Sequence, residues 1–299
     1  MITEYKHFLS ANDFLNFLCS WNNDLRGYVF RGHSREEYEL LPSILREDKR
    51  YISDNQYPRI KDGERRNSNL EWHQIQTEYM MLREFYKLSD QHGLKVPNAE
   101  RLRESLLTKY DLTFSLSMNG THYWIPSYLL ETTALAQHYG IPTRLLDWSY
   151  DPFISAYFAA SGVNQDEGNL AIWCFNAESI SLYSNLNKDF PFKVVTPPYS
   201  DNVNLAAQKG LFTHILTKFN FKEIDAGQIK VDRTPLDLKL DKLLPSQYQN
   251  KEKIFIKITL PCSEAKHLKE KLVQHGYGES RIYPGYTGIA NQVMSHYNA

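Results

Sequence analysis

The chain has 299 residues, of which 42% are hydrophobic and 23% are charged, and its formal net charge is −1. This composition is typical of a soluble globular protein with a large core, and the charge balance excludes a molecule-wide attraction to nucleic acid or anionic membranes. No apolar run reaches the roughly 18 residues of a membrane span. Any grip on RNA or DNA must therefore be local.

The cysteine and histidine pattern predicts neither a disulfide framework nor a metal site. The 3 cysteines, Cys19, Cys174 and Cys262, lie far apart among apolar neighbours. We interpret them as reduced core thiols of a cytoplasmic protein. The first residues lack the basic and apolar regions of a signal peptide. The 10 histidines are scattered, without an HExxH or CxxC motif.

The first elements are a helix and a strand. Residues 11–25 carry apolar side chains at helical spacing and predict a short amphipathic helix. The sequence YVFRGHS, residues 28–34, has three large β-formers that run into Arg31 and Gly32, so it predicts a strand that enters the protein body. Most arginines are exposed, and one at the end of a buried strand, before a glycine, suggests a binding role.

The next predictions follow from apolar periodicity and from stop signals. The polar segment 47–70 is expected to be an exposed loop, and 71–90 to be a helix with one apolar side. A second helix is expected to end at Gly140, because a glycine followed by an apolar residue and then a proline is typical of a Schellman stop.

A strand and a helix are predicted directly after that stop. Thr143–Trp148 has the pattern of a short strand. Asp151 then has the side chain of an N-cap, and Pro152 suits the first helical position. The apolar residues of this helix occupy more than one face, which indicates a buried helix.

The rest of the chain is rich in strands. In order, we expect strands at 170–175, 193–196, 254–260 and 279–283, a basic amphipathic helix at 263–275, a terminal helix, and loops at 197–205 and 222–250. Together the elements predict an α+β fold, with a split, mainly antiparallel sheet flanked by helices. We find no internal repeat or linker, so we predict one domain over 1–299, with loop insertions near 47–70 and 222–250.

Four segments in order resemble the FRG domain family, which is named for its (F/Y)RG motif. They are VFRG, LPSILR, AQHYGIPTRLLDWSYDPFISAYFA and AAQKGLFT. The resemblance runs discontinuously from about residue 27 to 290. The family is widespread in bacteria and phages, and membership by itself implies little about activity.

A second resemblance is to ADP-ribosyltransferases of the Arg-Ser-Glu type. In that family a first strand ends in Arg-Gly, a second strand ends in a Ser/Thr motif before an AxxFA-like helix, and a late strand carries a glutamate. Arg31, Ser149 and Glu279 match these three positions, and the resemblance implies an ADP-ribosyltransferase-like fold in which they are catalytic. The chain has no Ser-Thr-Ser motif and no E-x-E or Q-x-E before its last strand, so Gln208 and Asp147 remain alternatives to Glu279.

The resemblance implies NAD as a substrate, and several residue types suit it. A guanidinium binds a pyrophosphate in a bidentate manner, and a glycine lets a dinucleotide pack against the backbone. The implied NAD-binding residues are Arg31, Gly32, Gln137, His138, Arg144, Asp147, Trp148 and Gln208. Tyr139, Trp148 or Tyr157 would stack on the nicotinamide. A carboxylate is needed for the oxocarbenium-like transition state, and Glu279 or Asp147 would supply it.

Each of these residues also has a structural interpretation. Arg31 and Asp147 would form an ion pair that only fixes the fold. Arg144 would pair with Asp147 or Asp151. His138 would contact a helix C-terminus, and Ser149 would begin a turn before the Asp151 cap.

The lead hypothesis is therefore an NAD-dependent ADP-ribosyltransferase that modifies RNA or protein and acts as a bacterial toxin or antiphage effector. Its biological role, and a neutralising antitoxin partner, are implied by family resemblance alone. The alternative is a non-catalytic nucleotide-binding or protein-interaction module. A nuclease is less favoured because no Asp/Glu/His grouping predicts a metal site.

Overall fold

The computed structural model describes residues 2–19, 21–46, 69–105, 123–220, 223, 227–245 and 253–297. Among these residues, one sheet has seven strands in the order β1-β9-β5-β2-β4-β7-β6, and a second sheet pairs β3 with β8. The strands are β1 (Thr3–His7), β2 (Tyr28–His33), β3 (Tyr123–Trp124), β4 (Leu146–Ser149), β5 (Asn169–Asn176), β6 (Phe192–Val195), β7 (Gly210–Ile215), β8 (Thr217–Lys218) and β9 (Phe255–Pro261). Only β1 and β9 pair in parallel among these described strands, so the predicted mainly antiparallel sheet is confirmed.

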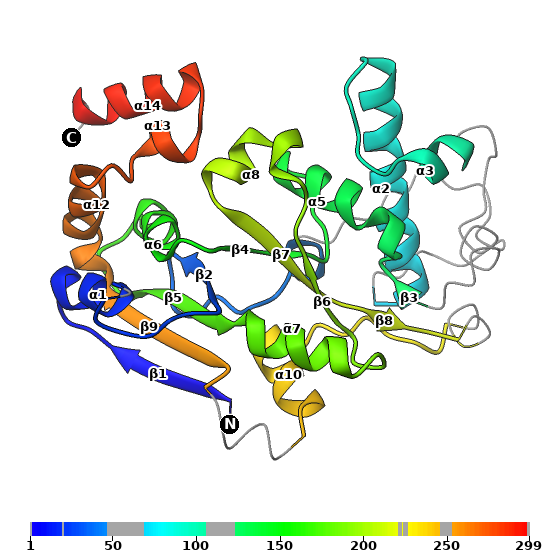
Figure 1. Ribbon diagram of the computed structural model, residues 1–299, viewed down its shortest axis with the longest axis horizontal. Coiled ribbons are helices and arrows are strands. Elements are labelled where there is room, and N and C mark those ends of the chain that lie inside the picture. The colour runs from blue at the N-terminus through cyan, green and yellow to red at the C-terminus, as the bar shows by residue number, and fades with distance from the viewer. Residues whose placement is uncertain are drawn as a thin grey trace.

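Helices cover both faces of the large sheet. In the described part of the chain, the helices longer than one turn are α1 (Ala11–Leu18), α2 (Glu71–Gln91), α3 (Glu100–Ser105), α5 (Leu130–His138), α6 (Pro152–Ser161), α7 (Ala177–Leu186), α8 (Val203–Ala207), α10 (Leu236–Leu243), α12 (Ala265–Gln274), α13 (Glu279–Ile282) and α14 (Tyr286–Tyr297). One face packs against α1, α6 and α12, and the other against α7 and α10. Helices α2 and α3 lie at one end of the molecule, and α12, α13 and α14 lie at the other (Figure 1).

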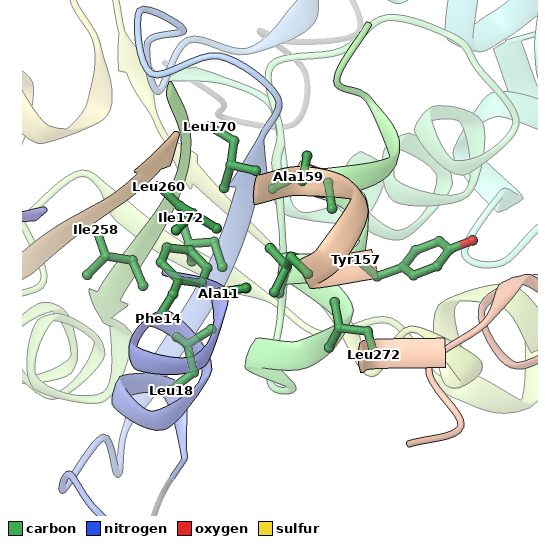
Figure 2. Close-up of a cluster of buried hydrophobic side chains, with 14 of the residues drawn as sticks. Ala11, Phe14, Leu18, Tyr157, Ala159, Leu170, Ile172, Ile258, Leu260 and Leu272 are labelled. Carbon is green, nitrogen blue, oxygen red and sulfur yellow. The ribbon is translucent and has the colours of Figure 1, made fainter. Parts of the chain in front are cut away.

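The core between the sheet and helices α1, α6 and α12 follows from the apolar periodicity of the sequence. Phe14 and Leu18 are one helical turn apart, so both point from α1 to the sheet (Figure 2). Ile172 and Ile258 are register partners on β5 and β9, and therefore share the same face. Each such buried side chain contributes roughly 1.5 to 3 kcal/mol of transfer free energy.

The end of α5 and the start of α6 are as predicted. The N–H of Ile141 donates to the Ala136 carbonyl, the N–H of Gly140 donates to Gln137, and Gly140 has φ +93°, which together make a Schellman motif. At α6 the Asp151 carboxylate accepts a hydrogen bond from the Phe153 N–H, with Pro152 at the first helical position.

Other predictions are wrong or lie outside the described residues. The predicted strand at 279–283 is helix α13. The predicted loops at 222–250 and 197–205 contain α10 and part of α8. Helix α1 ends at Leu18, well before residue 25. The predicted loop 47–70 falls almost wholly outside the described residues.

The sheet is weakly joined between β2 and β4. Strand β2 pairs with β5 along its whole length, from Tyr28 to His33. Within the described residues, its register with β4 consists of the single pair Phe30 and Ser149. The next β2 residue, Arg31, therefore lies where the two halves of the sheet part.

Candidate functional site

Arg31 contacts the strand across this junction. Its Nη1 pairs with Oδ1 of Asp147 at 2.5 Å and donates to the Asp147 carbonyl oxygen at 2.8 Å. The Arg31 side chain is only 12% exposed, whereas the Asp147 side chain is 63% exposed. The sequence-predicted ion pair therefore exists, with a shielded cation and a carboxylate that faces solvent.

His33 fixes the other side of the guanidinium. It follows Arg31 by two residues and so lies on the same face of β2. Burial and the Arg31 charge lower the pKa of His33 to about 3, so the ring is neutral at pH 7. Its Nδ1–H donates to the Tyr38 carbonyl at 3.1 Å, which leaves Nε2 to accept from Arg31 Nε at 3.0 Å.

One amino group of Arg31 has no partner in the described part of the chain. Nη2 makes no hydrogen bond with a described residue, and it is not one of the buried unpartnered atoms of those residues, so solvent reaches it. His33 and Asp147 thus hold Arg31 through Nε and Nη1.

Gln137 and His138 extend the cluster from the end of α5. The Gln137 amide donates to Asp147 Oδ1 at 3.4 Å, and its carbonyl accepts from the Thr143 hydroxyl. Burial lowers the pKa of His138, and the nearby Asp147 charge opposes this only in part, so the ring is neutral at pH 7. Crowding by protein atoms opposes ionisation of Asp147, but the Arg31 charge and hydrogen bond outweigh it and lower the pKa of that carboxyl.

Ser149 and Gln208 hold backbone segments together. Ser149 is buried, its hydroxyl donates to the Gln208 carbonyl at 2.7 Å, and it accepts from the Asp151 N–H at 2.9 Å. The Gln208 side chain donates to the Ile282 carbonyl at 3.4 Å. Ser149 thus begins a turn before the Asp151 cap, as its structural interpretation predicted.

Gly32 and Trp148 both take part in the packing of the fold. A Cβ at Gly32 would lie 2.0 Å from the Ser155 carbonyl oxygen, so this glycine permits the close approach of α6. Trp148 is buried, its indole donates to Thr213 at 2.8 Å, and its ring packs against Phe175. Tyr139, in contrast, is exposed near the end of α5.

Comparison with known families agrees with the sequence pattern. The model of the FRG domain matches residues 26–168. The segment 26–168, a little under half of the chain, therefore carries an FRG domain. This segment contains both partners of the Arg31–Asp147 pair as well as Gln137 and His138, but neither Gln208 nor Glu279. No curated protein and no solved structure matches the chain.

Arg144 lies in a buried ionic network. Its guanidinium binds Glu71 at 2.6 Å and Glu78 at 2.8 Å, and both carboxylates come from α2. The predicted partners Asp147 and Asp151 are therefore wrong. Burial alone would lower the pKa of Arg144, but the charges of Glu71 and Glu78 outweigh it and raise that pKa. This network ties the start of β4 to α2.

Glu279 lies apart from the Arg31 cluster. It is on α13 rather than on a strand, close to the phenols of Tyr157 and Tyr283. Burial, with a contribution from Glu279, raises the pKa of Tyr157 to about 12. Tyr157 extends from α6 (Figure 2) and shares its cluster with Phe30 of β2. Arg31 is the next residue of β2 and so points to the opposite face of the sheet.

The sequence interpretation missed His33 as a site residue. The available signal was the alternation of β2, which places the side chain two positions after Arg31 on the same face. In the described part of the chain, no group of His, Cys, Asp and Glu suits a metal ion. No helix in that part is long and apolar enough to cross a membrane.

Proposed function

We propose that this protein is an ADP-ribosyltransferase-like enzyme that transfers ADP-ribose from NAD to a macromolecule. The observation that carries the proposal is the Arg31–Asp147 pair, in which a guanidinium held on two sides, with its Nη2 amino group unpartnered among the described residues, adjoins an exposed carboxylate. Such a pair suits a substrate that has an anionic pyrophosphate and develops positive charge at a ribose carbon.

Arg31 would bind the NAD pyrophosphate through Nη2. Charge-assisted hydrogen bonds from arginine to phosphate oxygens are short and directional, and the contacts to His33 and Asp147 reduce the side-chain entropy lost on binding. The exposed ring of Tyr139 is the nearby aromatic surface on which nicotinamide would stack.

The transfer step requires the bond between the nicotinamide nitrogen and ribose C1′ to break. Nicotinamide leaves as a neutral molecule with the bonding electron pair, and C1′ becomes oxocarbenium-like. Ionised Asp147 would stabilise that positive charge. A lone pair of the acceptor then bonds to C1′, and the acceptor proton passes to neutral His138 or to water.

Ser149 enters this proposal as a positioning residue. Its hydroxyl joins the Gln208 and Asp151 backbones and thereby fixes the end of β4. A role as a cytoplasmic toxin or antiphage effector, with a neutralising antitoxin partner, is proposed from the family resemblance.

A second candidate is a non-catalytic nucleotide-binding module. The observation that favours it is that the Ser149 hydroxyl is already bonded to two backbone groups and that Glu279 is on α13 rather than on a strand, so neither residue matches its place in the Arg-Ser-Glu pattern. In this case Arg31 binds a nucleotide, and no bond is broken.

Calorimetric titration with NAD, together with chromatographic detection of released nicotinamide, separates the two candidates. The wild type should bind NAD and release nicotinamide, and Arg31→Lys should lose both because lysine lacks the planar fork. Arg35→Lys is the matched control, since Arg35 is exposed and bonded to Gln165. Binding without nicotinamide release supports the module, and absence of binding overturns both candidates.

A further inference from the structure

A surface rich in tyrosine and cations lies beyond Ser149, at the end of β4. We call it the tyrosine edge and define it by six residues: Tyr150, Tyr199, Lys209, Tyr277, Arg281 and Tyr283. They come from the β4–α6 turn, the segments on either side of α8, and the region around α13. The Tyr150 N–H donates to the Lys209 carbonyl at 3.0 Å, and the Tyr199 hydroxyl donates to the Gly210 carbonyl at 3.1 Å, so these segments are in direct contact.

Lys209 has a conformation that a lysine rarely adopts. Its φ is +47°, in the left-handed region that favours glycine. The chain has a glycine at the next position, Gly210, yet the left-handed conformation falls on the lysine. Such strain persists only where the surrounding structure holds the residue in place, and it clusters at functional sites. The Lys209 ammonium lies 3.0 Å from Asp151 Oδ2, and about half of this side chain remains exposed.

Arg281 brings a second cation to the same carboxylate. Its guanidinium is 3.5 Å from Asp151 Oδ2 and stacks over the Tyr277 ring at 4.0 Å. Two cations therefore face one buried carboxylate, which leaves one positive charge in excess at the surface. Glu279 and Lys269, which both lie near Tyr157, add one negative and one positive charge to this neighbourhood, so the excess of one positive charge is unchanged.

Three rings of the tyrosine edge are open to solvent. Tyr150 is 50% exposed, and Tyr199 and Tyr283 are each 40% exposed. Exposed aromatic rings interleaved with partly exposed cations are the arrangement on which single-stranded nucleic acids bind, because bases stack on rings while phosphates pair with cations. Because the overall charge of the chain is −1, any attraction of nucleic acid must come from a local group of cations, and this surface provides one.

We propose that the tyrosine edge binds single-stranded nucleic acid and that this is the acceptor class of the enzyme. The part that concerns the acceptor rests on the proposed function. Tyr150 follows Asp147 by three residues, at most about 10 Å along the chain. A strand whose bases stack on Tyr150 and Tyr199, and whose phosphates contact Lys209 and Arg281, thus passes within one or two nucleotides of the Arg31–Asp147 pair.

Fluorescence anisotropy with a labelled single-stranded RNA 12-mer, in the absence of NAD, tests this surface. The variant Lys209→Gln/Arg281→Gln retains hydrogen-bonding groups for Asp151, and we expect it to weaken binding about tenfold. Its slope of log affinity against log salt should fall by about 1.4, the value for two lost phosphate contacts on a single strand. Tyr150→Ala should weaken binding at least fivefold, and it leaves the Asp151 ion pairs in place.

The matched control is Lys87→Gln/Lys266→Gln, which removes the same charge from two exposed lysines on α2 and α12. Equal weakening in this control, or no RNA binding by the wild type, overturns the proposal. RNA binding without any NAD turnover leaves the surface intact and rejects only the proposed function. Transfer of ADP-ribose to protein, with no RNA modified, rejects the acceptor assignment and leaves the transferase intact.

Discussion

Arg31 and Asp147 form an ion pair where β2 and β4 part, with the cation shielded by the fold and the anion exposed to solvent. The arrangement differs from an ordinary surface ion pair because His33 holds the guanidinium from a second side. It also differs from a fully buried pair, because the Asp147 side chain keeps its contact with water and avoids much of the cost of desolvation.

Asp147→Asn should separate substrate binding from chemistry. We expect nicotinamide release to fall by about 100-fold or more, because the amide cannot stabilise developing positive charge, while NAD affinity changes only a few-fold. Asp24→Asn, which alters an exposed ion pair with Arg26, should leave both quantities unchanged. Unchanged turnover in Asp147→Asn would show that the carboxylate serves only to hold Arg31.

Ser149→Ala should affect stability more than turnover. The variant leaves the Asp151 N–H and the Gln208 carbonyl without their partner, which costs about 1 to 3 kcal/mol of the free energy of unfolding. Nicotinamide release should change less than about threefold. Denaturant unfolding and a turnover assay on the same preparation check this, and a large loss of turnover at unchanged stability would instead make Ser149 catalytic.

Local chemistry explains which parts of the fold were predictable. The Schellman stop at Gly140 and the Asp151 cap depend on residues within one or two turns, so the sequence shows them directly. Helix α13 was wrongly predicted as a strand. It is so short that its apolar residues cannot distinguish the period of a helix from that of a strand.

Long-range pairing explains the parts of the site that were not predictable. The Arg144 partners Glu71 and Glu78 are on α2, some 73 and 66 residues earlier in the chain. Nothing local to Arg144 distinguishes them from Asp147 and Asp151, which are nearer in sequence. Likewise, the role of Gly32 depends on the Ser155 carbonyl of a helix that is remote in the chain.

Arg144→Ala should destabilise the protein strongly. It leaves Glu71 and Glu78 buried without their counter-ion, and removing one partner of a buried pair costs about 3 to 5 kcal/mol. Arg26→Ala is the matched control, because Arg26 also pairs with a carboxylate but is exposed, and it should cause no measurable change. If Arg144→Ala does not fold, Glu71→Gln should still lower the midpoint of unfolding. Wild-type stability in both Arg144→Ala and Glu71→Gln would contradict the network's role.

The free energy of unfolding should decrease as the pH is lowered below about 6.5. Burial lowers the pKa of both His33 and His214 to about 3, so the unfolded chain takes up these protons before the folded protein does. The stabilisation is complete above the unfolded histidine pKa and is lost as the pH falls towards 3, at about 1.4 kcal/mol per pH unit for each ring. His214→Gln should remove roughly half of this histidine contribution to the slope between pH 6 and 4.5. The exposed His92→Gln control should leave the slope unchanged, and an equal slope in His214→Gln would contradict the assignment.

The central claim is that the Arg31–Asp147 pair acts on NAD. The most direct test incubates the protein with NAD labelled in its adenylate phosphate, together with a mixture of cellular RNA and protein, and follows the label into each fraction. The account predicts that label is transferred to the RNA fraction by the wild type, that Arg31→Ala loses this transfer, and that Arg35→Ala retains it. A folded wild type that neither binds nor consumes NAD would contradict the account and leave Arg31 as a structural residue.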